Sequence, residues 1–163
     1  MKRIIIILAT LMMLCPDIEA SSRKAEESPA VKVVTSNKNA KRLEGGMLKM
    51  AKPFLKKTPI SIIMDDIEMM VICPLENEDD GFTEKAEKML GSYMKVYEID
   101  DEFNRMYIYI DAPQNESFTE LIIHYTRPEK SILVFEGDFT VESLKKVGEL
   151  SKQQRQQKRQ SKR

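Results

Sequence analysis

Few residues in this sequence could carry catalysis or hold a metal. The 163-residue chain contains one histidine and two cysteines, so it cannot form the cysteine and histidine clusters of structural zinc sites. It also has no glycine-rich phosphate loop and no Gly-x-Ser-x-Gly nucleophile motif. We therefore expect no catalytic residue, no metal site and no cofactor, and a binding or interaction module is favoured over an enzyme.

The sequence also lacks an apolar run long enough to span a membrane. Residues 4–14 are apolar apart from Thr10, but a spanning helix needs about 20 apolar residues. Lys2 and Arg3 precede this run, and the small residue Ala20 follows it. That order is typical of a secretory signal peptide. We expect residues 1–20 to be removed, and the protein to reach the periplasm or cell envelope of a Gram-negative bacterium.

The two cysteines have different expected fates. Cys15 lies within the predicted signal peptide and raises the alternative of a lipid anchor, but the large Leu14 stands where a lipoprotein signal has a small residue. Removal of residues 1–20 would leave Cys73 alone, which excludes an internal disulfide in the exported chain. Cys73 shares an apolar face of its strand, so we interpret it as a buried structural thiol.

Both ends of the exported chain look unfolded, and between them we expect a single α+β domain over residues 41–150. Residues 21–40 are predicted to be a flexible segment. Residues 151–163 hold six basic residues, several glutamines, no acid and no apolar side chain, so a disordered basic tail is predicted. Such a tail could contact anionic surfaces, but it lacks the aromatics that stack on bases, and no nucleic-acid partner is expected.

The spacing of apolar residues predicts the elements of this domain. Recurrence every three to four residues predicts helices near 43–54, 82–93 and 141–147. Alternation predicts strands at 67–73, 94–99, 104–111, 118–125 and 132–137. Because the later strands are joined by short connections, antiparallel pairing is favoured. The predicted fold is α+β, a mostly antiparallel sheet of about five strands with helices packed on one face.

Alternation also predicts which side chains face away from those helices. If Ile67, Ile108 and Ile123 face the core, their sequence neighbours form the opposite side of the sheet. That side is rich in tyrosine, methionine and arginine, which are enriched at protein interfaces. Cross-strand packing of tyrosines on an ordinary exposed sheet is the alternative. The candidate residues for binding a protein partner or a second copy of the chain are Met70, Arg105, Tyr107, Tyr109, Ile122 and His124.

A hydrolase built from scattered carboxylates is the alternative function. The acidic stretch at 76–80 lacks the spacing of a calcium-binding loop, so a solvated loop is the preferred interpretation. His124 lies in mid-strand, where a surface or partly packed side chain is more common than a catalytic base.

Two stretches resemble a known family. Residues 118–147, FTELIIHYTRPEKSILVFEGDFTVESLKKV, contain the GDFT sequence before a helix, and residues 45–57 read GGMLKMAKPFLKK. Over about residues 41–148 the chain resembles the exported Bacteroidetes family of unknown function numbered 4252. The resemblance implies export and an α+β domain. That family has no established activity, so no catalytic residue can be carried over.

Overall fold

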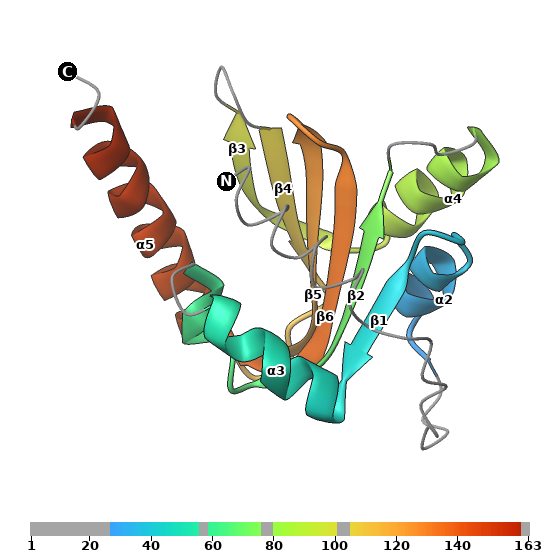
Figure 1. Ribbon diagram of the computed structural model, residues 1–163, viewed down its shortest axis with the longest axis horizontal. Coiled ribbons are helices and arrows are strands. Elements are labelled where there is room, and N and C mark those ends of the chain that lie inside the picture. Colours follow the sequence, from blue (N-terminus) through green and yellow to red (C-terminus); the bar gives the residue numbers. More distant parts are fainter. Residues whose placement is uncertain (1–26, 56–58, 76–79, 101–104, 161–163) are drawn as a thin grey trace.

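The computed structural model describes residues 27–55, 59–75, 80–100 and 105–160 (Figure 1). The predicted signal peptide at 1–20, with Cys15, and most of the acidic stretch at 76–80 lie outside the described residues.

A six-stranded antiparallel sheet forms the centre of the domain, in the order β1-β2-β6-β5-β4-β3. The strands are β1 (Lys41–Glu44), β2 (Ile67–Pro74), β3 (Met94–Asp100), β4 (Arg105–Ile110), β5 (Ser117–Arg127) and β6 (Ser131–Thr140). The predicted α+β class and antiparallel pairing are confirmed. The sixth strand is β1, which the sequence does not predict. Its single apolar residue, Leu43, falls within the predicted helix at 43–54, since a four-residue strand shows too little alternation to be recognised.

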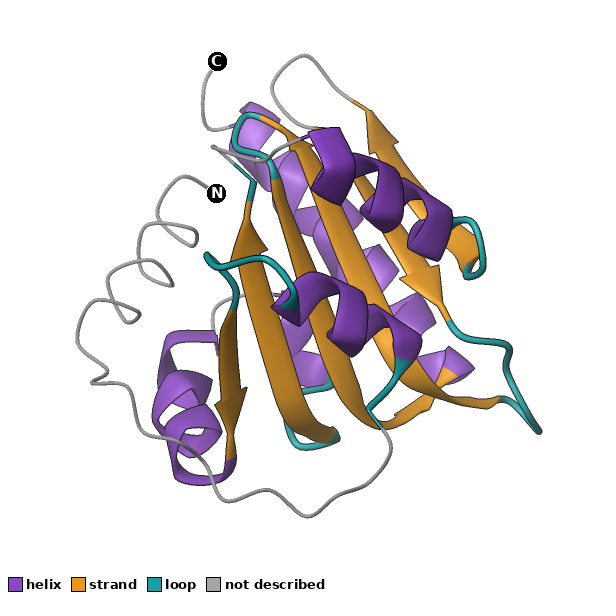
Figure 2. Ribbon diagram, turned by 90° about the vertical axis from the view of Figure 1, so that its right-hand side faces the viewer, coloured by secondary structure: helices purple, strands orange, loops and turns teal. Residues whose placement is uncertain are grey.

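Helices cover both faces of the sheet, so the prediction of one covered face is wrong. On one side lie α3 (Gly45–Leu55), the short 3-10 helix η1 (Pro59–Ile62) and α5 (Val141–Gln160); on the other lie α2 (Pro29–Thr35) and α4 (Asp80–Leu90) (Figure 2). We call these the α5 face and the α2/α4 face.

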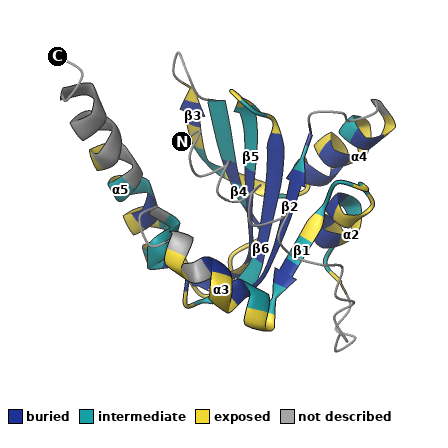
Figure 3. Ribbon diagram, viewed as in Figure 1, coloured by how far each residue is buried: buried dark blue, intermediate teal, exposed yellow. Residues whose placement is uncertain are grey.

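The burial of the central strands explains why helices cover both faces of the sheet. Every residue of β2 from Met69 to Cys73 is buried, which requires apolar layers on both sides. Burial is deepest in β2 and β6 and falls toward β4 and β3 (Figure 3).

The segment predicted to be flexible before the domain contains a helix. Ser28 caps α2, its Oγ accepting a hydrogen bond from the backbone N–H of Val31 over 3.2 Å, and Pro29 occupies the first turn. Ala30, Val31 and Val34 are fully buried against the sheet. The Ser-Pro pair is a helix-start signal that could have identified α2 from the sequence.

The tail predicted to be disordered is helical as far as Gln160, because α5 continues through it. Lysine, arginine and glutamine have good helix propensity, and extending an existing helix avoids the cost of nucleation. The buried residue Val147 lies in the first half of α5. Toward its C-terminal end α5 diverges from the sheet (Figure 1).

Candidate functional site

The predicted aromatic residues do gather on one part of the sheet. Tyr107 on β4 lies opposite His124 on β5 and Glu98 on β3, while Tyr109 lies opposite Lys95. The Tyr107 ring centroid is 6.4 Å from that of Tyr109 and 6.2 Å from that of His124. Tyr107, Tyr109 and His124 are half-buried. We call these five residues the tyrosine face.

Charged side chains complete the tyrosine face. Lys95 Nζ lies 5.4 Å from the centroid of the Tyr107 ring, a cation–π arrangement. The same ammonium group donates to Glu98 Oε2 over 2.9 Å. This hydrogen bond to Glu98 is the main reason that the pKa of Lys95 is raised.

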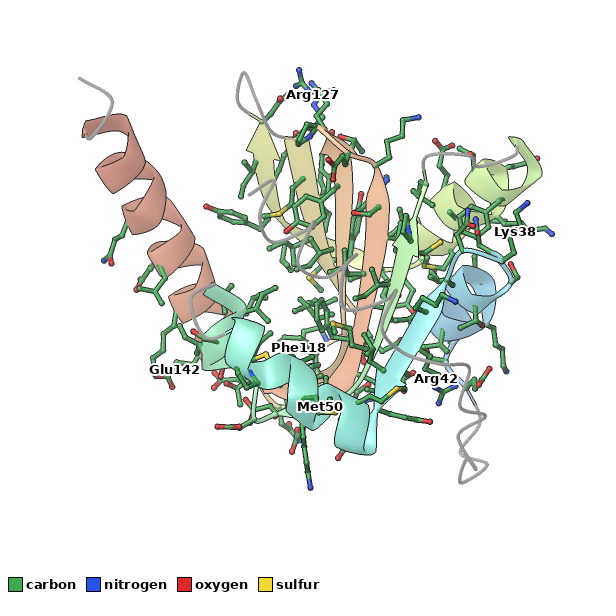
Figure 4. All side chains as sticks on the ribbon, viewed as in Figure 1. Lys38, Arg42, Met50, Phe118, Arg127 and Glu142 are labelled. Carbon is green, nitrogen blue, oxygen red and sulfur yellow. The ribbon has the colours of Figure 1, made fainter. Side chains whose placement is uncertain are left out.

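A second charge group lies at the rim. Asp100 accepts hydrogen bonds from Arg105 Nε over 2.9 Å and from Arg127 Nη2 over 2.6 Å. Chiefly through Arg105, these contacts lower the pKa of Asp100. Arg127 and Phe118 lie near the two ends of β5, with Arg127 at the C-terminal end (Figure 4).

Two predicted partner-binding residues are not available to a partner. Met70 is 1% exposed and Ile122 is 0% exposed. Met70 packs on the α5 face, away from the tyrosines, because a register shift between Ile67 and Met69 breaks simple alternation in β2. Ile122 is on the same side as Tyr109 but belongs to the core beneath α2 and α4.

Sequence reasoning missed four charged members of this surface. The strand register places Lys95 and Glu98 opposite the two tyrosines, and it places Asp100 and Arg127 opposite Arg105 at the rim. Alternation can assign a side chain to a face within one strand, but it does not determine which residues of neighbouring strands are opposite each other.

Other sequence-predicted residues have structural positions. Cys73 is fully buried, which agrees with the interpretation of a buried thiol. Tyr125, on the α5 face, has its pKa raised to about 12 by burial.

Within the described ranges, no three His, Cys, Asp or Glu side chains are arranged to hold a metal ion. Among the described helices, none combines the length and apolar character needed to cross a membrane.

Two glutamates from neighbouring strands converge. Glu120 on β5 and Glu136 on β6 are direct cross-strand partners on the α2/α4 side of the sheet. Glu120 is only 7% exposed, and its Oε2 accepts a hydrogen bond from the Tyr93 hydroxyl over 2.7 Å. Burial raises the pKa of Glu136, and the carboxylate of Glu120 raises it further. Glu120, Ile122 and His124 are two residues apart along β5 and so share one face. Because Ile122 makes that face partly apolar, the sequence contains a signal that Glu120 is buried.

Comparison with known proteins gives one match. No curated protein and no solved structure is significantly similar to this chain. The family model described as "Domain of unknown function (DUF4252)" matches residues 31–147, which run from α2 to the buried part of α5 and include both the tyrosine face and the glutamate pair. The predicted match to the family numbered 4252 is thereby confirmed, and the chain belongs to the DUF4252 family.

Proposed function

We propose that this protein is a small exported, non-catalytic binding module that associates through the tyrosine face. The observation that carries the proposal is the position of Tyr107. Its half-buried ring contacts Tyr109, His124 and Lys95 on the part of the sheet beyond α2, which packs on β2 and β6. Tyrosine supplies a large contact area at low entropic cost and is enriched at interfaces.

A second copy of the chain is the proposed occupant. The tyrosine face and its rim carry cations and anions in close proximity: Lys95 beside Glu98, and Asp100 between two arginines. In a two-fold dimer the same patch faces itself, so a patch with charges of both signs can be complementary to its own copy. A different protein partner is the other outcome of the experiment below.

The experiment is sedimentation equilibrium of the parent protein and of a Tyr107→Ala/Tyr109→Ala variant. Loss of two anchor residues should raise the dimer dissociation constant at least about fivefold, since hot-spot truncation costs more than about 1 kcal/mol. Met94→Ala is the matched control, because Met94 is 48% exposed on the neighbouring strand but lies opposite Ile110, on the α5 side. A parent that stays monomeric, or a control variant that dissociates as much as the double variant, would overturn the proposal.

The C-terminal half of α5 adds a second contact. Its basic residues lie on the part of the helix that diverges from the sheet (Figure 1). Near an anionic membrane each basic residue contributes about 1 kcal/mol, screened by salt. Deleting residues 152–163 should weaken salt-sensitive adsorption to phosphatidylserine vesicles and leave the melting temperature unchanged; undiminished adsorption would contradict this role.

A hydrolase is the second candidate, and the Glu120–Glu136 pair is the observation that favours it. A general acid needs a raised pKa, and burial raises that of Glu136. Against this reading, Tyr93 occupies one oxygen of Glu120, and Ser28 hydrogen-bonds to Glu136. We therefore assign the pair a different role below.

A further inference from the structure

One buried oxygen in the glutamate pair has no hydrogen-bond donor among the described residues. Oε2 of Glu120 accepts from Tyr93, but no group in the described part of the chain donates to Oε1, although it is buried. An unsatisfied buried carboxylate oxygen is costly. We therefore expect a neighbouring group to supply a donor to Oε1 of Glu120.

A second carboxyl group lies on the neighbouring strand. Glu120 and Glu136 are opposite each other across β5 and β6, and the Cβ atoms of such pairs are about 4.5–5.5 Å apart. Two ionised carboxylates on such a pair repel each other in a partly desolvated site. One proton between them would remove the repulsion and supply the donor that Oε1 lacks.

We propose that Glu120 and Glu136 share one proton, and that this proton site fastens the N-terminal end of α2 to the sheet. The pair is connected to α2 on both sides. The backbone N–H of Ala30 hydrogen-bonds to the Tyr93 hydroxyl, which itself donates to Glu120. Ser28, the N-cap of α2, acts on Glu136 as a hydrogen-bond donor, and this contact lowers the pKa of Glu136 and partly offsets the effect of burial.

The other charged groups around the pair do not replace the proton. Arg42 on β1 is a cation that acts on Glu136, and its Nη1 binds Glu27 over 2.6 Å while its Nη2 binds Glu44 over 3.4 Å. Its Nε is buried and has no hydrogen-bond partner among the described residues. Arg42 lies at the β1 edge near α2 (Figure 4). Glu27 adds further negative charge at Glu136, and Asp111 does so at Tyr93. Carboxylates outnumber the guanidinium, so an added proton is favoured.

The direction of the pH effect follows from the raised pKa of Glu136. A carboxyl whose folded pKa lies above its unfolded value binds its proton more tightly in the folded state. Stability is therefore full below the unfolded pKa and falls as pH rises toward the folded pKa of Glu136. Docking of α2 should be tighter at mildly acidic than at mildly alkaline pH.

Hydrogen exchange of the backbone amides in α2 tests this proposal, with rates corrected for the intrinsic pH dependence of exchange. Loss of the shared proton removes about one net hydrogen bond, so protection should be about fivefold lower at pH 8 than at pH 5. The backbone amide of Val134, in the core of the sheet, serves as the internal reference. Equal protection of α2 at both pH values, relative to Val134, would overturn the proposal.

Glu136→Gln separates the shared proton from a general pH effect. Its amide can donate to Glu120 Oε1 and still accept from Ser28, so α2 should keep the protection seen at low pH throughout the range. Glu68→Gln is the matched control, because Glu68 is exposed on β2, and it should leave the pH dependence of the parent unchanged. If Glu136→Gln retains that pH dependence, or if the Glu136 carboxyl carbon titrates by NMR at an ordinary glutamate pKa, the proton is not shared.

Discussion

The hydroxyl of Tyr93 donates a hydrogen bond to Oε2 of Glu120 across 2.7 Å, joining the turn after α4 to the middle of the sheet. Burial, with Glu120 as the next cause, raises the pKa of Tyr93. The hydroxyl therefore remains a donor throughout the physiological pH range. A charge-assisted hydrogen bond of this kind is stronger than a neutral one.

Tyr93→Phe should destabilise the fold because it removes the donor to Oε2 of the buried Glu120 carboxyl. We expect a loss of about 1–3 kcal/mol in the free energy of unfolding, measured with urea. Tyr107→Phe, in the half-exposed tyrosine face, is the control and should change stability by less than about 0.5 kcal/mol. Equal stability of the parent and Tyr93→Phe would show that this bond contributes nothing.

Gly137 should tolerate no side chain. It lies opposite Ile67 beside the register shift of β2, where a Cβ would overlap the backbone oxygen of Asp66. Backbone atoms cannot move aside as a side chain does, so Gly137→Ala should cost about 3 kcal/mol or more in unfolding free energy. Gly46→Ala is the matched control, since a Cβ there meets nothing within 4 Å inside α3, and alanine should stabilise that helix by up to about 1 kcal/mol. A fully stable Gly137→Ala protein would contradict the close approach.

Cys73 should react slowly with thiol reagents in the native protein. Its side chain is 0% exposed in the core beneath α2, and the thiol approaches the carbonyl oxygen of Pro74 at 3.8 Å. Cys73→Ser places a more polar group in that apolar surrounding and should cost about 1–3 kcal/mol. Its self-association should equal that of the parent, because Cys73 is not on the tyrosine face. Rapid labelling under native conditions would mean that the thiol is accessible.

Much of the fold could be predicted because the local signals agree with the final packing. The β5–β6 hairpin forms from two alternating runs joined by a turn. Thr140 caps the helix that follows, because its Oγ1 accepts from the backbone N–H of Ser143 over 3.1 Å. Alternation along β5 predicts that Leu121 and Ile123 face the core, and both are buried on the α5 face.

The errors arose where packing overrides local pattern. In β2 the irregularity next to Gly137 changes which side chains share a face, so Met70 was placed with the tyrosines instead of in the core. The glutamate pair depends on the register between β5 and β6, which pairs two residues sixteen positions apart in sequence. No property of Glu120 alone predicts that its opposite neighbour is also an acid.

The expected signal peptide gives a prediction at the N-terminus. Mass spectrometry of the protein recovered from outside the cytoplasm should find a chain that begins at Ser21, because Ala20 is the small residue before the predicted cleavage point. A chain that begins at a lipid-modified Cys15 would contradict this prediction and support membrane anchoring.

The most direct test of the proposed association is a mixing experiment with two charge-reversed proteins. Glu98→Lys makes the tyrosine face more positive and Lys95→Glu makes it more negative, so each variant should self-associate less than the parent because like charges oppose each other. An equimolar mixture in low salt should restore dimers, measured by sedimentation equilibrium, and added salt should weaken that recovery. If the mixture contains no more dimer than the two variants measured separately, the tyrosine face does not bind a second copy of the chain.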